Sequence, residues 1–224
     1  MPLSRRLSDP SGKRAEKSKE LLLEKRITNK ILCIALLGII FSGWSFQSKN
    51  GNISGKVLLK GKTPVSEAVV YIDKIPGRKF QPPEEPAVMD QRNLKFIPHV
   101  LPILVGTTVY FLNNDNVLHN VFSPDPCAGK LNLGTWFKGE VKKHTFTKPC
   151  VVTILCNVHP EMEAYIIVLE TPYFALTDKE GNFTIKDVPP GEYTLKVWHN
   201  KFKGKDIKIK VGNKGTVYVD LTVQ

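Results

Sequence analysis

The sequence predicts an all-β fold made of sandwiches. After residue 50 there is hardly any helical periodicity, and short segments of alternating apolar residues recur, among them "ISGKVLL", "TTVYFLN" and "VVTILC". Glycine, proline, asparagine and aspartate separate these segments, as is typical of strands joined by turns. With 42% apolar residues, 16 Gly and 16 Pro, the 224-residue chain is long enough for one or two such cores.

Residues 1–46 do not fit this β pattern. A basic head, with nine Lys or Arg among residues 1–30, runs into "ILCIALLGIIFSGWSF", which spans residues 31–46 without a charge. This layout is typical of an export signal whose positive side stays in the cytoplasm. The length fits either a signal peptide cleaved after about Ser45 or an N-terminal membrane anchor. We therefore expect the remaining chain to be periplasmic or otherwise extracytoplasmic, soluble after cleavage or tethered by 31–46.

The formal charge of +11 does not indicate a nucleic-acid-binding protein. Outside residues 1–30 the chain has 23 Lys or Arg and 17 Asp or Glu, without a dense basic block. Nucleic-acid-binding surfaces concentrate their positive charge on one face or stripe. We therefore expect no nucleic-acid partner.

Two strand patterns can be separated after residue 50. The segments "GNISGKVLLKGKTPVSEAVVYID" and "TDKEGNFTIKDVPPGEYTLKVWH" resemble the opening and the middle of a carboxypeptidase regulatory-like, or transthyretin-like, β-sandwich. This resemblance implies a small sandwich formed by residues 51–74 and 172–224. Residues 88–171, after a proline-rich connector, have their own strands. They form either a domain inserted into or fused with the small sandwich, or part of one continuous sandwich with long loops.

The segment "LCNVHPEMEAY" places Cys156, His159 and Met162 in the spacing C-x2-H-x2-M. If "VVTILC" is a strand, Cys156 ends an inward-facing row that includes Val152. The histidine and the methionine follow on the loop before the next strand, where a tight turn can aim them at the same point. A neighbouring segment, "NNDNVLHNVFS", supplies His119 as a fourth donor.

One thiolate, two imidazoles and one thioether form a soft, mixed donor set that suits copper better than its competitors. Imidazole and thiolate serve Cu(II), whereas thiolate and thioether serve Cu(I). We therefore expect one copper ion that alternates between Cu(I) and Cu(II). Pro160 limits the freedom of the short loop and is expected to hold His159 and Met162 in place.

These residues resemble the ligand pattern of type 1 (blue) copper proteins of the plastocyanin and amicyanin kind. His119 is followed by Asn120, and the short Cys-His-Met loop looks most like that of amicyanin. The wider run from "KFIPHVLPILVG" to "TPYFALTDKEGNF" resembles cupredoxin-like exported proteins labelled methylamine-utilisation-like. The resemblance implies a cupredoxin-like Greek-key β-sandwich in which His119, Cys156, His159 and Met162 bind copper. It also implies that the Asn120 side chain ties the two ligand-bearing loops together.

Other interpretations of this motif fit less well. Tetrahedral zinc sites seldom use methionine and more often show paired Cys or His spacings. A binuclear copper centre needs two cysteines close together, whereas Cys150 lies six residues before Cys156, or roughly 20 Å along a strand. Chance packing would leave Met162 in a core and His159 on a surface loop.

Cys127 and Cys150 need a separate explanation. Both fit the end of the sandwich remote from the metal, and in an oxidising compartment we expect them to form a disulfide. The alternative is two buried thiols.

We expect a one-electron carrier rather than an enzyme. An apolar surface around His159, with Pro160, Leu118 and Phe122, would dock a redox partner such as a c-type cytochrome or an exported oxidoreductase. The alternatives are a periplasmic module for copper delivery or storage, and a structural extracellular sandwich with a vestigial site. An oxidase or reductase is disfavoured because the sequence has neither an H-x-H pair for further copper ions nor a C-x-x-C-H motif for haem.

Overall fold

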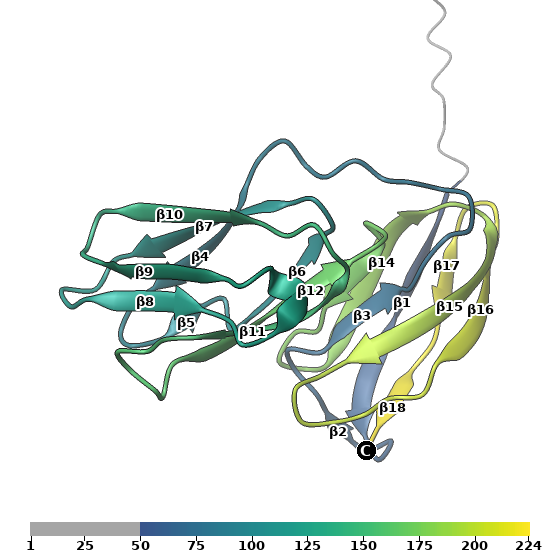
Figure 1. The fold of residues 1–224 in the computed structure, drawn as a ribbon. Helices are drawn as coiled ribbons and strands as arrows, with labels where there is room; N and C mark the ends of the chain where they lie inside the picture. Colours follow the sequence, from purple (N-terminus) through teal and green to yellow (C-terminus); the bar gives the residue numbers. More distant parts are fainter. Residues whose placement is uncertain (1–49) are drawn as a thin grey trace, which may run out of the picture. The chain divides into compact units, whose positions relative to one another are not determined.

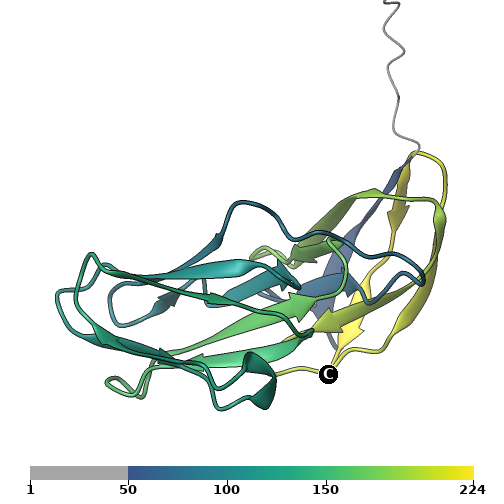
Figure 2. The same ribbon diagram turned by 45° about the horizontal axis from the view of Figure 1, so that its top comes forward.

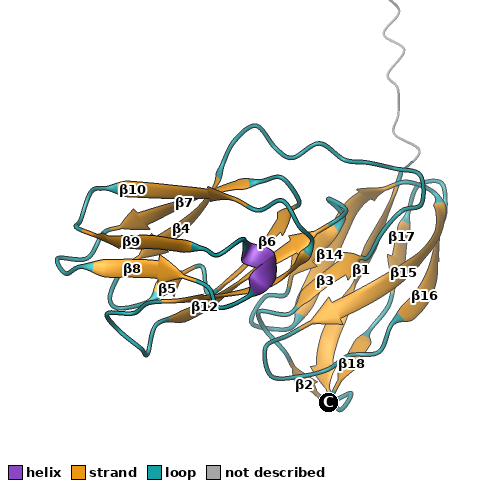
Figure 3. Cartoon of the chain, viewed as in Figure 1, coloured by secondary structure: helices purple, strands orange, loops and turns teal. Residues whose placement is uncertain are grey.

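The computed structural model describes residues 50–224, whose regular elements are β-strands and one short 3-10 turn, η1 (Pro126–Ala128), joined by loops (Figures 1 and 3). The all-β prediction is therefore confirmed. The predicted export segment, residues 1–46, lies outside the described residues and stays a prediction. Between residues 50 and 224 no helix is long and apolar enough to cross a membrane.

The middle of the chain forms the donor sandwich, residues 87–169, which carries the predicted metal ligands. Its four-stranded sheet has the order β10-β7-β4-β5 and contains β4 (Ala87–Gln91), β5 (Phe96–Ile97), β7 (Thr108–Asn113) and β10 (Val141–Thr145). Its five-stranded sheet has the order β6-β12-β11-β8-β9 and contains β6 (Val100–Leu104), β8 (His119–Phe122), β9 (Asn132–Trp136), β11 (Cys150–Leu155) and β12 (Glu163–Leu169). Alternate residues of these strands bury one core between the sheets, with Phe111, Trp136 and Ile154 among the largest fully buried side chains.

The two ends of the described chain form the second sandwich. One sheet has the order β14-β1-β17, with β2 and β18 also paired to β1, and contains β1 (Gly51–Leu59), β2 (Thr63–Pro64), β14 (Asn182–Val188), β17 (Thr216–Tyr218) and β18 (Leu221–Val223). The other sheet has the order β13-β3-β15-β16 and contains β3 (Val69–Ile72), β13 (Phe174–Leu176), β15 (Gly191–Trp198) and β16 (Ile207–Val211). Figure 2 shows β1, in blue, beside the yellow C-terminal strands with which it pairs in parallel.

Strand β12 serves two packing surfaces because successive side chains of a strand point to opposite faces. Ala164, Ile166 and Val168 belong to the core of the donor sandwich. Ile167 and Leu169, on the other face, pack with Val69 and Trp198 of the second sandwich in a cluster of their own. The division into separately folding domains stays a prediction, but the two strand sets share this apolar contact.

The five-stranded sheet also brings the two ligand-bearing segments together. In the antiparallel pair of β11 and β8, Leu155 lies opposite Phe122. Both are the last residues of their strands, so the chain beyond Leu155 runs back along β8 toward His119. Residues separated by 37 positions in the sequence, His119 and Cys156, become neighbours for this reason.

Candidate metal centre

Three of the predicted ligands form a cluster. One donor atom from each of His119, Cys156 and His159 lies within 4.8 Å of the other two. The Nδ1 atom of His119 lies 4.0 Å from Cys156 Sγ and 3.1 Å from His159 Nδ1. His119 is completely buried and Cys156 is 3% exposed, whereas His159 is half-buried.

Strand alternation explains the position of Cys156. Val152 and Ile154 are fully buried on one face of β11, and Cys156 continues this row one residue beyond the end of the strand. Its sulfur therefore points inward. The backbone N–H of Asn120, 3.4 Å away, donates a hydrogen bond to it.

The ligand loop closes by a turn. The N–H of Met162 donates to the carbonyl of His159 at 3.0 Å, with Pro160 at the second position of the four-residue turn. Proline favours this position because its fixed φ matches the turn. Met162 is 1% exposed and lies in the same core cluster as Cys156. The turn therefore returns the thioether to the interior, three residues after a histidine that reaches the surface.

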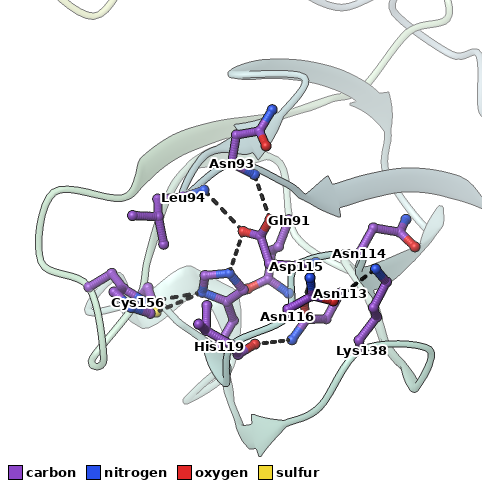
Figure 4. A network of polar contacts seen from close by, with 12 residues as sticks. Gln91, Asn93, Leu94, Asn113, Asn114, Asp115, Asn116, His119, Lys138 and Cys156 are labelled. Carbon is purple, nitrogen blue, oxygen red and sulfur yellow. Dashed lines mark hydrogen bonds and ion pairs between the residues drawn. The ribbon is translucent and has the colours of Figure 1, made fainter.

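Asp115 holds the His119 ring from the opposite side (Figure 4). Its Oδ2 atom lies 2.8 Å from His119 Nε2. A carboxylate accepts hydrogen bonds, so Nε2 carries the hydrogen and Nδ1 keeps its lone pair. The Nδ1 lone pair then faces Cys156 and His159, which is the arrangement a metal ligand requires.

The Asp115 carboxyl is ionised readily although it is largely buried. Desolvation by burial acts to raise its pKa, but hydrogen bonds from the N–H groups of Leu94 and Asn93 and from His119 outweigh this effect and lower the pKa below 3.8. An ionised acceptor beside Nε2 strengthens the electron donation of the imidazole through Nδ1.

Asn120 connects three segments around the centre. Its Oδ1 accepts from the N–H of Asn157 at 3.4 Å, and its Nδ2 donates to Asn132 Oδ1 and to the carbonyl of Gly134, at 3.1 and 2.8 Å. The side chain therefore links the ligand loop to β8 and β9. This is the arrangement that the resemblance to blue copper proteins implies.

The structure joins Cys127 and Cys150 in a disulfide, which connects η1 to the first residue of β11. Cys150 lies at the opposite end of β11 from Cys156, so the disulfide is separated from the donor cluster by the length of the strand. In the described part of the chain, Cys156 is the cysteine outside a disulfide. Its sulfur is therefore the thiol at the site.

The donor set fits a copper ion. A metal bonded to nitrogen and sulfur at about 2.0–2.3 Å brings its donors to roughly 3 to 4 Å from one another, and the two distances at His119 Nδ1 fall in this range. Two imidazoles and a thiol, with a buried thioether on the same loop, are the soft and borderline donors that copper prefers. The residues that would hold copper are His119, Cys156 and His159, with Met162 as the fourth.

Asp115 is the site residue that the sequence analysis missed. The sequence contains a signal for it, since Asp115 and His119 are four residues apart in "NNDNVLHN". The contact depends on the loop between β7 and β8 curving back, because this segment is not helical. The N–H of Asp115 donates to Asn113 Oδ1, and Asn113 Nδ2 donates to the carbonyl of Val117, which produces that curvature.

Comparison with known protein families gives a match over the last part of the chain. Residues 160–224 match the model of the carboxypeptidase regulatory-like domain. The matched range begins at residue 160, inside the ligand loop, rather than at residue 172. No curated protein matches the chain.

Similar solved structures are cupredoxins and a larger copper protein. A Cu(I) form of an amicyanin mutant is 26% identical and covers 37% of this chain and 81% of its own, with a TM-score of 0.36. A purple cupredoxin from Nitrosopumilus maritimus is 27% identical and covers 37% and 98%, with a TM-score of 0.34. A copper-containing nitrite reductase from Thermus scotoductus is 27% identical and covers 45% and 25%, with a TM-score of 0.36.

Proposed function

We propose that this chain is an exported one-electron carrier that holds a single type 1 copper ion and catalyses no reaction of its own. The observation that carries the proposal is the cluster of His119, Cys156 and His159, whose donor atoms lie within 4.8 Å of one another. Among residues 50–224 this is the one such group of His, Cys, Asp or Glu side chains. A single centre suits the transfer of single electrons.

The protein groups around the donors favour fast electron transfer. A bound copper ion would supply the Cu(I)/Cu(II) couple. Asp115 fixes the ring of His119, and the N–H of Asn120 fixes the sulfur of Cys156. Donor atoms that are held by hydrogen bonds move little when the copper ion changes its oxidation state. The reorganisation energy of electron transfer is therefore small.

We expect electrons to enter and leave the copper site through His159, because His159 is more exposed than His119. Its neighbours Val158 and Pro160 are exposed, and so is Val117, two residues before His119. Leu118 and Phe122, which the sequence analysis placed on this surface, are half-buried. A small apolar surface of this kind supports the weak and quickly released contacts of redox partners, such as a c-type cytochrome or another exported oxidoreductase.

Electron exchange tests this function directly. The full-length chain, loaded with one equivalent of copper, is titrated reversibly with redox mediators and then mixed with a reduced c-type cytochrome in a stopped-flow instrument. We expect a reversible one-electron wave and rapid oxidation of the cytochrome. A Cu(I) form that the mediators cannot oxidise, and that therefore accepts no electron from the reduced cytochrome, would instead support copper delivery or storage.

A variant of the surface separates docking from the metal site. Val158→Lys adds a charge beside His159 without removing a donor, and we expect slower reaction with the cytochrome at an unchanged potential. Val151→Lys, on an exposed position of β11 remote from His159, is the matched control and should react at the unmodified rate. Equal slowing by both substitutions would contradict the assignment of His159 as the route of electron transfer.

A further inference from the structure

We propose that Asp115 is a positioning residue of the metal centre and that it anchors this centre to the turn between β4 and β5. The carboxylate holds His119 in the tautomer that can bind a metal, lowers the reduction potential, and uses the turn at Asn93 and Leu94 as its fixed support. The inference rests on the proposed function where it concerns the potential, but not where it concerns the tautomer.

The carboxylate accepts three hydrogen bonds from two different parts of the fold (Figure 4). Oδ1 accepts from the N–H of Asn93 at 2.7 Å. Oδ2 accepts from the N–H of Leu94 at 3.0 Å and from His119 Nε2 at 2.8 Å. The two backbone donors leave the carboxylate little freedom to rotate, and 13% of the Asp115 side chain is exposed. His119 therefore meets an acceptor that is already oriented.

The turn that supplies these N–H groups is strained. Asn93 and Leu94 have φ angles of 55° and 56°, in the left-handed region. Arg92 and Lys95 exchange both of their backbone hydrogen bonds across them, as in a two-residue hairpin. Asparagine tolerates this backbone region, whereas leucine is rarely found there. The two hydrogen bonds to Asp115 offset that strain, so the turn and the carboxylate stabilise each other.

The loop that carries Asp115 is fixed independently of the turn. Asn113 Nδ2 donates to the carbonyls of Val117 and Trp136, both at 2.9 Å. Asn114 Nδ2 donates to Asp90 Oδ1 at 2.8 Å. The backbone between β7 and β8 is thus held at several points. Loss of the carboxylate should therefore free the His119 ring without unfolding the loop.

The Asp115 carboxylate would change the reduction potential of a bound copper ion in one direction. A negative carboxylate on Nε2–H makes the imidazole a stronger donor, and a stronger donor stabilises Cu(II) relative to Cu(I). Asp115 should therefore lower the reduction potential. Contacts of this kind change metal affinity by roughly 10–100-fold when they are removed.

Two substitutions test these effects in the full-length chain. Asp115→Asn keeps the shape but removes the charge, and we expect a higher reduction potential. Asp115→Ala removes all three hydrogen bonds of the carboxylate, and we expect copper affinity, measured by competition with a chelator, to fall by roughly 10–100-fold. Asp178→Asn is the matched control because Asp178 also accepts backbone N–H groups in a turn, from Glu180 and Asn182, but contacts no histidine.

A second substitution distinguishes a positioning role of Asp115 from a purely structural one. Leu94→Gly relieves the left-handed strain at the turn and keeps its N–H, so it should offset the loss of thermal stability in Asp115→Ala. We expect Leu94→Gly to restore neither the copper affinity nor the reduction potential of the Asp115 variants. If the Leu94→Gly background restored both, Asp115 would act through the turn alone and the proposal would be overturned.

Nitrogen NMR of the histidine rings in the metal-free chain provides a readout that does not need copper. We expect His119 to show the Nε2–H tautomer in the unmodified protein and a mixture of tautomers in Asp115→Ala with Leu94→Gly. An unchanged single tautomer in that variant would overturn the proposal. Failure of the unmodified chain to form a redox-active copper centre would instead refute the proposed function, and the NMR result would still decide the role of Asp115.

Discussion

The Nδ1 atoms of His119 and His159 face each other at 3.1 Å. At this distance one hydrogen lies between them. The contact of His119 Nε2 with Asp115 assigns the other hydrogen of that ring, so His119 Nδ1 accepts and His159 Nδ1 donates. A metal ion bound to both nitrogens would replace this hydrogen. The contact already holds the two rings in place, so metal binding would require a change of tautomer in His159 rather than a movement of the fold.

Replacing Met162 tests the role of the thioether. Met162→Gln should retain copper and colour but lower the reduction potential, because a harder oxygen donor favours Cu(II). Met89→Leu is the control, since Met89 is fully buried in the same core but lies on β4, in the other sheet. Voltammetry of both variants measures the effect. An equal change of potential in both would show that Met162 acts through packing alone.

The disulfide should stabilise the fold without influencing the metal. Replacing Cys127 and Cys150 together by alanine opens a loop with a sequence separation of 23, and the free energy of unfolding should fall by roughly 2–5 kcal/mol. Urea unfolding measures this loss, and the spectrum of the loaded protein should not change. Free thiols at both positions in protein from an oxidising compartment, found by mass spectrometry, would contradict the bond.

The two packing faces of β12 indicate which truncated chains should fold. A chain that begins at Ser48 retains the whole compact unit and should fold without the basic head. A fragment of residues 88–171 should aggregate, because it exposes Val100, Ile167 and Leu169, which otherwise pack against the second sandwich. Size-exclusion chromatography distinguishes the two. A monomeric, cooperatively unfolding 88–171 fragment would show that the donor sandwich is an independent domain.

We expect protonation of His199 to reduce the stability of the fold in weak acid. Desolvation by burial, together with the charge of Lys201, lowers the pKa of His199 below its usual 6.5. The folded state therefore prefers the neutral ring, so its contribution to stability is complete above pH 6.5 and is lost as the pH falls through the lowered pKa. His199→Gln should flatten the decrease in the free energy of unfolding between about pH 7 and pH 5. A decrease as steep as that of the unmodified chain would refute this assignment.

The sequence predicts those parts of the site that depend on local pattern. Period-two alternation along "VVTILC" is sufficient to turn Cys156 inward, and Pro160 after His159 is sufficient to predict a tight turn. The resemblance to carboxypeptidase regulatory-like sandwiches is also returned by the family match over residues 160–224. Export, location and redox partners stay predictions.

What the sequence does not predict depends on contacts between distant segments. The role of Asp115 requires the turn at Asn93 and Leu94, more than twenty residues earlier, and this turn lacks the glycine that usually marks a two-residue hairpin. The surface near His159 shows the same limit. Val117 rather than Leu118 is exposed there, because the loop between β7 and β8 is shaped by the hydrogen bonds of Asn113 and not by strand alternation.

The most direct test of the central claim is the visible and EPR spectrum of the full-length chain after copper loading and oxidation, with Cys156→Ser beside it. The account predicts an intense visible band from thiolate-to-Cu(II) charge transfer in the unmodified protein and its absence in Cys156→Ser, since the sulfur of Cys156 is the donor that produces it. A colourless unmodified protein that stays reduced would contradict the electron-carrier function. An unchanged spectrum in Cys156→Ser would contradict the assignment of the ligands.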